Sequence, residues 1–480
     1  ARTIPWGDDP MDLGGATLVS EGVTGSVEVH GPDDRRVVAS QAAAPLDRAL
    51  AAAGMETSAT FEIDATPSPG TRSAARGHRL EVDAPGPGWG QVLLSADEAG
   101  VLRFHFGTPV ESPARRGRGG DAGRLAYTIP AAPSPAPEGP RTRGLAGALG
   151  RTFVKVLVFH AGEAALGAAG QTLAGIWERN KVPDRLRRWG PEDYDRSDVP
   201  DLDAADAQAW HHLGGGRSLL LLHGTFSRAD QAFGGMAADA VATLHGRYEG
   251  RVFALDHPTL SRTPAENVDR LLELLPSDVH LDLDVVAHSR GGLVARRLAG
   301  RGDPRLRVRR VVFAGAPNGG TPLASPAHIN RLLDVYANLL TFFPDNGVTD
   351  AMEGLLAVVQ DVVLGMVDGL RGLTAMVPDS DVEFEGGAVA EAPDWFALAS
   401  DYTPTELGLK AFMAPLASQV FPGLANDLVV PADSVWRGPG TRPFPLADDA
   451  VLLFGEADGV GHSDYFRNAR AVERVLTWLT

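Results

Sequence analysis

At 480 residues the chain is long enough for two or three domains with substantial hydrophobic cores. Its formal net charge of −17 argues against nucleic acid as a partner and against electrostatic docking to an anionic membrane. The chain contains no cysteine, which excludes a disulfide framework, a zinc–thiolate site and thiol redox chemistry.

The composition also bears on where the protein works. A chain without cysteine suits a reducing cytoplasm, although secreted proteins also occur without disulfides. Residues 1–10 lack the apolar run of a signal peptide, and no segment is apolar over the length that a bilayer requires. We therefore expect a cytoplasmic protein, and secretion after removal of a leader preceding Ala1 stays open as the alternative.

Residues 1–129 carry short runs in which apolar and polar residues alternate, separated by glycine, proline and aspartate. Alternation with a period of two is typical of strands with one buried face, and turn residues at this spacing favour a small antiparallel sandwich. The runs begin at Thr17, Ser26, Ser58, Arg79, Gln91 and Val101. We predict a β-rich, sandwich-like domain over residues 1–129.

A proline-rich segment at residues 130–144 predicts a semi-rigid linker between domains, with five prolines between Pro130 and Pro140. Because such linkers are preferred sites of proteolysis, we hypothesise that the first domain restrains or targets the rest of the chain. A regulatory protease acting near Arg141–Arg143 would then change the activity. A plain spacer is the alternative.

Residues 145–216 are predicted to form a helical connecting segment, in which residues 145–188 resemble a long helix rich in alanine and glycine. Close packing against other helices is one interpretation of this composition. Peripheral contact with a membrane surface is the other.

The most informative stretch is an apolar strand at residues 281–287 that runs into Ser289 and then into a helix beginning at Gly292. Strand, tight turn with a central serine, and helix is the context of a nucleophile elbow. Such a turn is strained, so the positions two before and two after the serine carry little side chain. Ala287 and Gly291 occupy them, and Ala287 departs from the usual glycine by one methyl group.

Further strands are predicted around this one, at residues 217–222, 251–256, 308–314 and 451–454. The strand at 217–222 is continuously apolar and ends in His223-Gly224. An oxyanion hole in this arrangement uses the backbone N–H after the nucleophile and one from the loop after the earlier strand. These are the amides of Arg290 and of Thr225 or Phe226.

A serine hydroxyl is a weak nucleophile until a histidine accepts its proton, and that histidine needs a carboxylate to hold its tautomer. In the expected chain order, Asp427 and His462 follow Ser289 as acid and base. Asp433 and Asp458 are the competing acids. We expect His288 to point away from Ser289 and His223 to be structural.

Together these motifs resemble the α/β-hydrolase superfamily, and within it the lipase and esterase branch. The resemblance covers residues 217–480, whereas the N-terminal domain resembles no family that we recognise. It is carried by Leu222–Phe226, Ala287–Gly292, Gly315–Ala324, Asn426–Pro431 and Gly461–Ser463. It implies a mostly parallel sheet covered by helices on both faces, and no metal or cofactor.

An insertion over residues 322–382 has apolar residues at helical spacing. Amphipathic helices there are predicted to form a lid over the active-site mouth, the alternative being an extra core layer. The predicted substrate contacts are Leu332, Leu339, Phe342 and Phe343. The sequence thus predicts a serine hydrolase for hydrophobic carboxylic esters, with medium or long acyl chains preferred. An acyltransferase using the same three residues, or a catalytically silent binding protein, are the alternatives.

Overall fold

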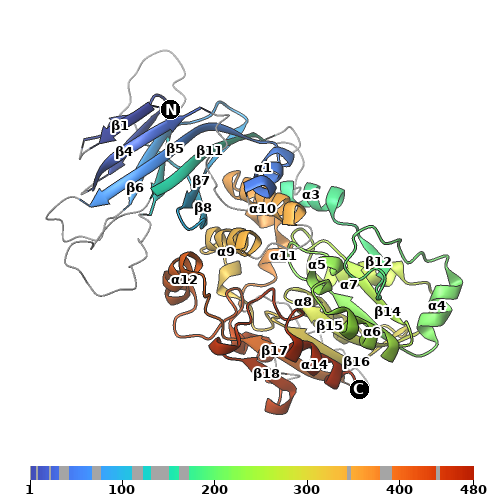
Figure 1. Ribbon diagram of the computed structural model, residues 1–480. Helices are drawn as coiled ribbons and strands as arrows, with labels where there is room; N and C mark the ends of the chain where they lie inside the picture. Colours follow the sequence, from blue (N-terminus) through green and yellow to red (C-terminus); the bar gives the residue numbers. More distant parts are fainter. Residues whose placement is uncertain are drawn as a thin grey trace.

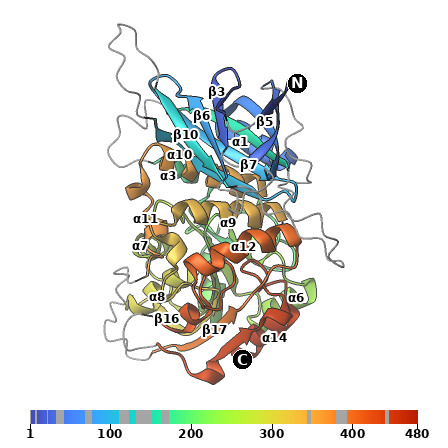
Figure 2. The same ribbon diagram turned by 90° about the vertical axis from the view of Figure 1, so that its left-hand side faces the viewer.

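The computed structural model describes residues 2–6, 9–20, 23–31, 43–67, 77–110, 123–130, 151–161, 172–342, 348–378, 392–438 and 444–480. Figure 1 shows two bodies, a β-sandwich that holds the N-terminus and an α/β domain that holds the C-terminus. Figure 2 shows that helices α9, α10 and α12 lie between them. The α/β domain comprises the described residues from 172 onward.

The predicted sandwich is present and consists of two antiparallel sheets. The first has the order β1-β4-β5-β11-β7-β8 and the second the order β2-β3-β6-β10-β9. The strands are β1 Arg2–Trp6, β2 Met11–Asp12, β3 Ala16–Ser20, β4 Val23–His30, β5 Met55–Pro67, β6 His78–Asp83, β7 Trp89–Asp97, β8 Leu102–Phe106, β9 Thr108–Pro109, β10 Arg124–Ile129 and β11 Arg151–His160. All six alternating runs predicted from the sequence are strands, because one side of each pleat faces the core that contains Val27, Leu80 and Tyr127.

The predicted long helix at residues 145–188 is wrong over residues 151–160, whereas Leu173–Lys181 within the same range does form helix α3. Residues Arg151–His160 form strand β11, which pairs with β5 on one side and β7 on the other in the middle of the first sheet. The sequence RTFVKVLVFH is rich in valine and phenylalanine, and such residues pack better on a pleated sheet than on a helix. The sandwich therefore includes a strand that follows the proline-rich segment, and residues 131–150 of that segment lie outside the described residues.

The first sheet of the sandwich is buried on both faces where it meets the α/β domain. In β7, Leu93 belongs to the sandwich core, whereas Val92 and Leu94 belong to the large core that continues into the α/β domain. Helix α1, Ala43–Ala52, covers this outer face and packs against α10. The two bodies therefore share one hydrophobic core and are not simply tethered.

The α/β domain is built on a seven-stranded sheet with the order β12-β14-β13-β15-β16-β17-β18. Only the edge strand β12 is antiparallel to its neighbour. The strands are β12 Arg185–Arg188, β13 Arg217–Leu222, β14 Val252–Asp256, β15 Leu281–His288, β16 Leu306–Ala314, β17 Asp394–Ser400 and β18 Val451–Phe454. This confirms the predicted mostly parallel sheet.

Helices cover both faces of this sheet, which explains why β13 is continuously apolar. Leu220 and Leu222 face one helical layer, which contains α7 and α8, while Leu219 and Leu221 face the layer of α6 and α14. The helices are α3 Leu173–Lys181, α4 Ala207–Gly214, α5 Ala229–Phe233, α6 Ala238–Arg247, α7 Pro264–Leu274, α8 Gly291–Gly300, α9 Ile329–Phe342, α10 Val348–Val363, α11 Arg371–Thr374, α12 Leu407–Val420, α13 Ala432–Trp436 and α14 Ala469–Trp478. Short 3₁₀ turns occupy Pro322–Ala324, Val367–Gly369, Asp448–Ala450 and Glu456–Asp458.

The predicted helical insertion lies between β16 and β17, and its main helices are α9 and α10. Both helices are buried along most of their length because the sandwich lies against one side and the rest of the α/β domain against the other. Residues 379–382 of the predicted insertion fall outside the described residues.

Two strands of the α/β sheet were not predicted. β12, with the sequence RLRR, falls inside the predicted helical segment and carries three arginines. Its edge position lets Arg187 turn inward, where its guanidinium donates to the carbonyls of Asp193 and Arg196. β17, DWFALAS, lies between the predicted insertion and Asp427, a stretch in which no strand was predicted. Over the described ranges, the helices all fall short of the length and apolarity that a membrane span requires.

Candidate active site

Ser289 lies in a tight turn between β15 and α8, as the sequence predicts. Its φ angle of 51° places a non-glycine residue in the left-handed region, which is strained, and its backbone N–H donates to the carbonyl of Ala314 at 2.9 Å. A Cβ on Gly291 would lie 2.4 Å from the carbonyl oxygen of Leu222. A Cβ on Gly224 would lie 2.6 Å from the Cβ of Ser289. The turn therefore fits against the end of β13 only with glycine at both positions.

The three residues predicted to act together are connected by hydrogen bonds. Ser289 Oγ lies 3.0 Å from His462 Nε2, and His462 Nδ1 lies 2.8 Å from Asp427 Oδ2. Ser289 and His462 are each 2 % exposed and Asp427 is 1 % exposed. Because Nδ1 faces a carboxylate, it carries the proton, which leaves Nε2 free to accept the serine hydroxyl.

Asp427 is held by four donors. Its Oδ1 accepts from the backbone N–H groups of Val429 and Val430 at 3.1 and 2.8 Å. Its Oδ2 accepts from His462 and from the hydroxyl of Tyr465 at 2.9 Å. Burial alone would raise the pKa of Asp427, but the neighbouring His462 and the two backbone donors bring it below its usual value. The carboxylate is therefore ionised at neutral pH.

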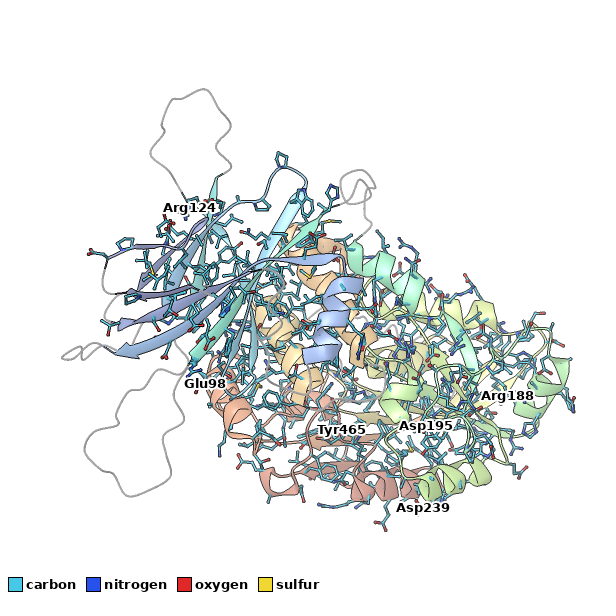
Figure 3. All side chains as sticks on the ribbon, turned by 45° about the horizontal axis from the view of Figure 1, so that its top comes forward. Glu98, Arg124, Arg188, Asp195, Asp239 and Tyr465 are labelled. Atoms are coloured by element: carbon cyan, nitrogen blue, oxygen red, sulfur yellow. The ribbon has the colours of Figure 1, made fainter. Side chains whose placement is uncertain are left out.

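Tyr465 is a site residue that the sequence analysis missed. It is buried beside Asp427, in the α/β domain, where Figure 3 labels it. The three-residue spacing from His462 brings it back toward the same carboxylate, because the chain turns at residues 462–467. That spacing was the available signal.

The competing acids lie elsewhere. Asp433 is in the first turn of α13, where its carbonyl accepts the N–H of Arg437. Asp458 accepts the N–H of Gly455 and forms an ion pair with Arg470 at 3.2 Å, both at the surface. Of the three candidates, Asp427 is the one that contacts His462.

Two further histidines support the site. His223 Nε2 accepts the N–H of His257 at 3.0 Å, so the proton of its ring lies on Nδ1, which donates to the carbonyl of Gly224. Both bonds hold backbone groups, in line with the structural role predicted for His223. His288 Nε2 donates to the carbonyl of His462 at 2.9 Å, and burial lowers the pKa of His288 to about 3. We predicted that its side chain points away from Ser289, but it lines the same pocket and holds the loop that carries His462.

The backbone amides predicted to form the oxyanion hole are free of hydrogen bonds within the part of the chain that the structure describes. The N–H groups of Thr225, Phe226 and Arg290 donate no hydrogen bond to any acceptor among the described residues. Thr225 and Phe226 line the pocket beside Ser289. The side chain of Arg290 points away into the interior, where its Nε donates to the carbonyl of Gly372 at 2.9 Å and ties the Ser289 turn to α11.

A pocket of about 90 Å³ opens at Ser289 and His462. Helices α9 and α10 supply one side of it through Tyr336, Leu339, Leu340, Val348 and Ala351. Of the four predicted substrate contacts, Leu339 lines this pocket, while Leu332 is buried in the core two turns earlier and Phe342 packs against that core. Phe343 lies outside the described residues. Tyr336, which the sequence analysis did not single out, lies on the pocket face of α9.

A cluster of possible metal ligands lies in the sandwich and not in this pocket. Ligand atoms of Glu28, His30 and Glu62 lie within 4.8 Å of one another. Both carboxylates already have partners, because Glu62 accepts from Arg151 at 3.4 Å and Glu28 accepts from Thr3 at 3.2 Å.

The strand order of the α/β domain confirms the α/β-hydrolase fold that the sequence resembles. β12 is the antiparallel edge strand, Ser289 follows β15, the Asp427 loop follows β17, and His462 follows β18. The sheet places these segments at the same edge because parallel strands all end there.

No curated protein matches the chain. Among solved structures it is similar to the mature lipase BlEst2 of Bacillus licheniformis, with 15% identity, a TM-score of 0.32, and coverage of 62% of this chain and 99% of that one. It is also similar to a bromoperoxidase from Bacillus anthracis (16% identity, TM-score 0.31, 55% and 92% coverage). Lipase 1 from Pelosinus fermentans is a third (13% identity, TM-score 0.33, 55% and 96% coverage).

A family model covers the α/β domain from the last residue of α3 onward. It is described as a domain of unknown function, DUF7379, and it matches residues 181–480, which is more than half of the chain. The chain therefore belongs to the DUF7379 family.

Proposed function

We propose that this protein is a serine hydrolase that cleaves carboxylic esters through an acyl-enzyme. The observation that carries the proposal is the continuous chain of hydrogen bonds from Ser289 through His462 to Asp427, with Ser289 and His462 lining a pocket beside Thr225 and Phe226. Each part has a defined chemical role in acyl transfer.

The geometry supports the following sequence of steps. Ser289 Oγ attacks the ester carbonyl carbon while His462 Nε2 takes the hydroxyl proton. The carbonyl oxygen becomes an oxyanion that the amides of Arg290 and of Thr225 or Phe226 stabilise. His462 then gives its proton to the departing alkoxide, which leaves as the alcohol, and the acyl group stays bonded to Ser289. A water molecule, deprotonated by His462, hydrolyses this ester and restores the hydroxyl of Ser289.

Asp427 acts through His462 in this scheme. It holds Nδ1–H at 2.8 Å, which keeps the histidine in the tautomer whose Nε2 is basic, and its negative charge stabilises the imidazolium that forms. The hydroxyl of Tyr465 and the two backbone donors hold Asp427 in place. No metal ion or cofactor is required by these steps.

For the predicted lid, we propose a fixed cap instead of a hinged one. Opening it would separate α9 and α10 from the sandwich, α1 and α3, against all of which this helical layer packs. It would also break the bonds from the N–H groups of Leu173 and Ala174 to Asp361 of α10, at 2.7 and 2.9 Å. Because these contacts are buried, breaking them would cost free energy, and this favours a cap that stays in place.

A fixed cap over a pocket of about 90 Å³ limits the acyl group. An engineered cavity of about 150 Å³ accepts benzene, so the space here suits a short acyl chain. We therefore propose a preference for acetyl to butyryl esters, shorter chains than the leucine and phenylalanine content of the insertion predicts. The lining of Phe226, Leu339 and Val348 still favours an apolar acyl group.

A fluorophosphonate probe tests the proposal, because only an activated serine reacts with it. We expect the label on the Ser289 peptide in wild type and none in Ser289→Ala. The control Ser463→Ala removes another pocket hydroxyl and should still be labelled. A wild-type protein that takes no label would contradict the proposal and favour a silent binding protein.

A series of p-nitrophenyl esters from acetate to palmitate then tests the substrate. We expect kcat/KM to be greatest between acetate and butyrate and to fall at longer chains. Higher rates at octanoate and beyond would contradict the fixed cap and restore the lipase-like expectation. If the protein reacts with the probe in the first test and, in a separate assay without probe, transfers the acyl group of an ester to an added alcohol faster than to water, it is an acyltransferase.

A further inference from the structure

One turn of α9 contacts the sandwich on one face and the Ser289 pocket on the other. On the sandwich face, Asn338 Oδ1 accepts the N–H of Leu102 at 2.9 Å and its Nδ2 donates to the carbonyl of Leu102 at 2.8 Å. Four residues earlier, Asp334 Oδ1 accepts the N–H of Phe104 at 2.8 Å. These two side chains thus pair with β8, the edge strand of the first sheet, as a neighbouring strand would.

Tyr336 lies between these two residues in the sequence and on the opposite face of the helix. A separation of two residues corresponds to roughly 200° around an α-helix, so contacts of 334 and 338 with β8 turn residue 336 toward the pocket. Its ring packs edge-on against Phe226 with 5.0 Å between ring centroids. Tyr336 lines the pocket together with Ser289 and Thr225.

Tyr336 shares the lining of the pocket with Ser289 and Thr225, and both of these side chains lower the pKa of its phenol. Burial raises the pKa of this phenol, and those two hydrogen-bonding side chains only partly offset the rise, so the hydroxyl keeps its proton at neutral pH. A protonated phenol that lines the pocket together with the nucleophile and with Thr225 of the predicted oxyanion hole is a candidate hydrogen-bond donor to the negative charge that develops there.

We propose that Tyr336 is a further catalytic residue, which donates a hydrogen bond to the oxyanion, and that the sandwich positions it through Asp334 and Asn338. The inference rests on the proposed function of Ser289. It gives the N-terminal domain a role in the chemistry, because the edge of its sheet sets the position of one donor in the active site.

The first test is Tyr336→Phe, which removes the hydroxyl and keeps the ring against Phe226. Loss of one oxyanion donor lowers kcat by about 10²-fold in a well-studied serine protease, and we expect a loss of that order on p-nitrophenyl butyrate with KM nearly unchanged. An unchanged kcat would overturn the proposal. So would a higher kcat, because the hydroxyl would then obstruct the site.

The second test separates positioning from general stability. Asn338→Leu removes both hydrogen bonds to Leu102 at similar volume, and we expect kcat to fall at least about tenfold. In the double variant Tyr336→Phe with Asn338→Leu, the second change should add little, because the hydroxyl that it misplaces is already absent. Full additivity of the two losses would overturn the positioning role. Should Asn338→Leu fail to fold, Asn338→Ala replaces it in the same comparison.

Gln360→Leu is the matched control. Its amide donates to the carbonyl of Ala53 at 2.9 Å, so it also joins the cap to the sandwich, but from α10 and away from Tyr336. We expect an unchanged kcat, and an equal loss in this control would overturn the specific role of Asn338. Fluorophosphonate labelling of wild type distinguishes the two proposals: if Ser289 labels and Tyr336→Phe is fully active, the function stands and this inference fails.

Discussion

Asn338 and Leu102 are 236 positions apart in the chain and share two hydrogen bonds, one in each direction. The side-chain amide of a helix residue thereby replaces the backbone of a missing strand at the edge of the sandwich. An exposed strand edge would otherwise present unpaired N–H and C=O groups. The same helix carries Tyr336 and Leu339 into the pocket of Ser289, so the domain interface and the candidate active site share one element.

Replacing the acid of the site should abolish turnover. In Asp427→Asn the residue can no longer hold the required histidine tautomer, and we expect kcat to fall by about 10³-fold or more. The matched control is Asp433→Asn, six residues away on α13, which should stay within about twofold of wild type. A strong loss in Asp433→Asn with an active Asp427→Asn would transfer the acid role to Asp433.

Tyr465→Phe tests the support of Asp427. The change removes one donor at 2.9 Å from a buried carboxylate, and a hydrogen bond to a charged group contributes about 1.5–3 kcal/mol. We expect kcat/KM to fall about tenfold or more. With one donor fewer the pKa of Asp427 should rise, so the low-pH limb of activity should move to higher pH. Tyr194→Phe, a partly exposed tyrosine beside Trp189, is the control and should leave both quantities unchanged.

Gly224→Ala should damage the site more than the fold. The added Cβ would lie 2.6 Å from the Cβ of Ser289 and 3.2 Å from its Oγ, so the serine or its loop has to move. Displacement by about 1 Å costs about 10²-fold in rate, and we expect a loss of this order in kcat/KM. Gly246→Ala, in helix α6, meets no atom within 4 Å and should keep full activity. Equal activity of the two variants would contradict the close fit between β13 and the Ser289 turn.

Asp334 should make stability depend on pH. Burial raises its pKa to about 7, while the N–H of Phe104 and the charge of Arg103 act in the opposite direction. Because the folded state binds this proton more tightly than the unfolded state, its stabilising contribution is complete below about pH 4 and is lost as pH rises toward about 7.

We therefore expect the thermal midpoint of wild type to fall from about pH 5 to about pH 8, and to fall less in Asp334→Asn. Thermal denaturation followed by circular dichroism at both pH values measures this difference. The control Asp239→Asn changes an exposed carboxylate, labelled in Figure 3, and should keep the wild-type difference. An identical fall in wild type and Asp334→Asn would show that Asp334 is not responsible.

Cleavage at residues 141–143 should not release the sandwich. β10 precedes this segment and β11 follows it, and β11 pairs with both β5 and β7 inside the first sheet. A site for a specific protease inserted at Arg141–Arg143 allows the cut to be made at one place. We expect the two fragments to elute together in size-exclusion chromatography with unchanged esterase activity. Separation of the fragments would restore the hypothesis of a detachable regulatory domain.

Much of the candidate site could be predicted because its signals are local. A strained turn requires small residues around Ser289, and parallel strands of known order end at one edge of a sheet, which brings Asp427 and His462 to it. The strands of the sandwich could also be predicted from their alternating runs, because one face of each strand is buried. Tyr336 was missed because a single tyrosine on a helix carries no motif signal, and the three-residue spacing of Tyr465 from His462 indicates its position only once the turn at residues 462–467 is known.

The tertiary structure decided how the two domains meet. Residues 151–160 have an apolar pattern compatible with a buried helix or a buried strand, and only the pairing partners β5 and β7 select the strand. That choice moves the boundary of the sandwich beyond the proline-rich segment. The cap helices α9 and α10 were predicted from periodicity, but which of their faces meets the pocket depends on β8 and α1, whose contacts are distant in sequence. Local chemistry thus determined the identity of the reacting residues, and long-range packing determined the surroundings that select their substrate.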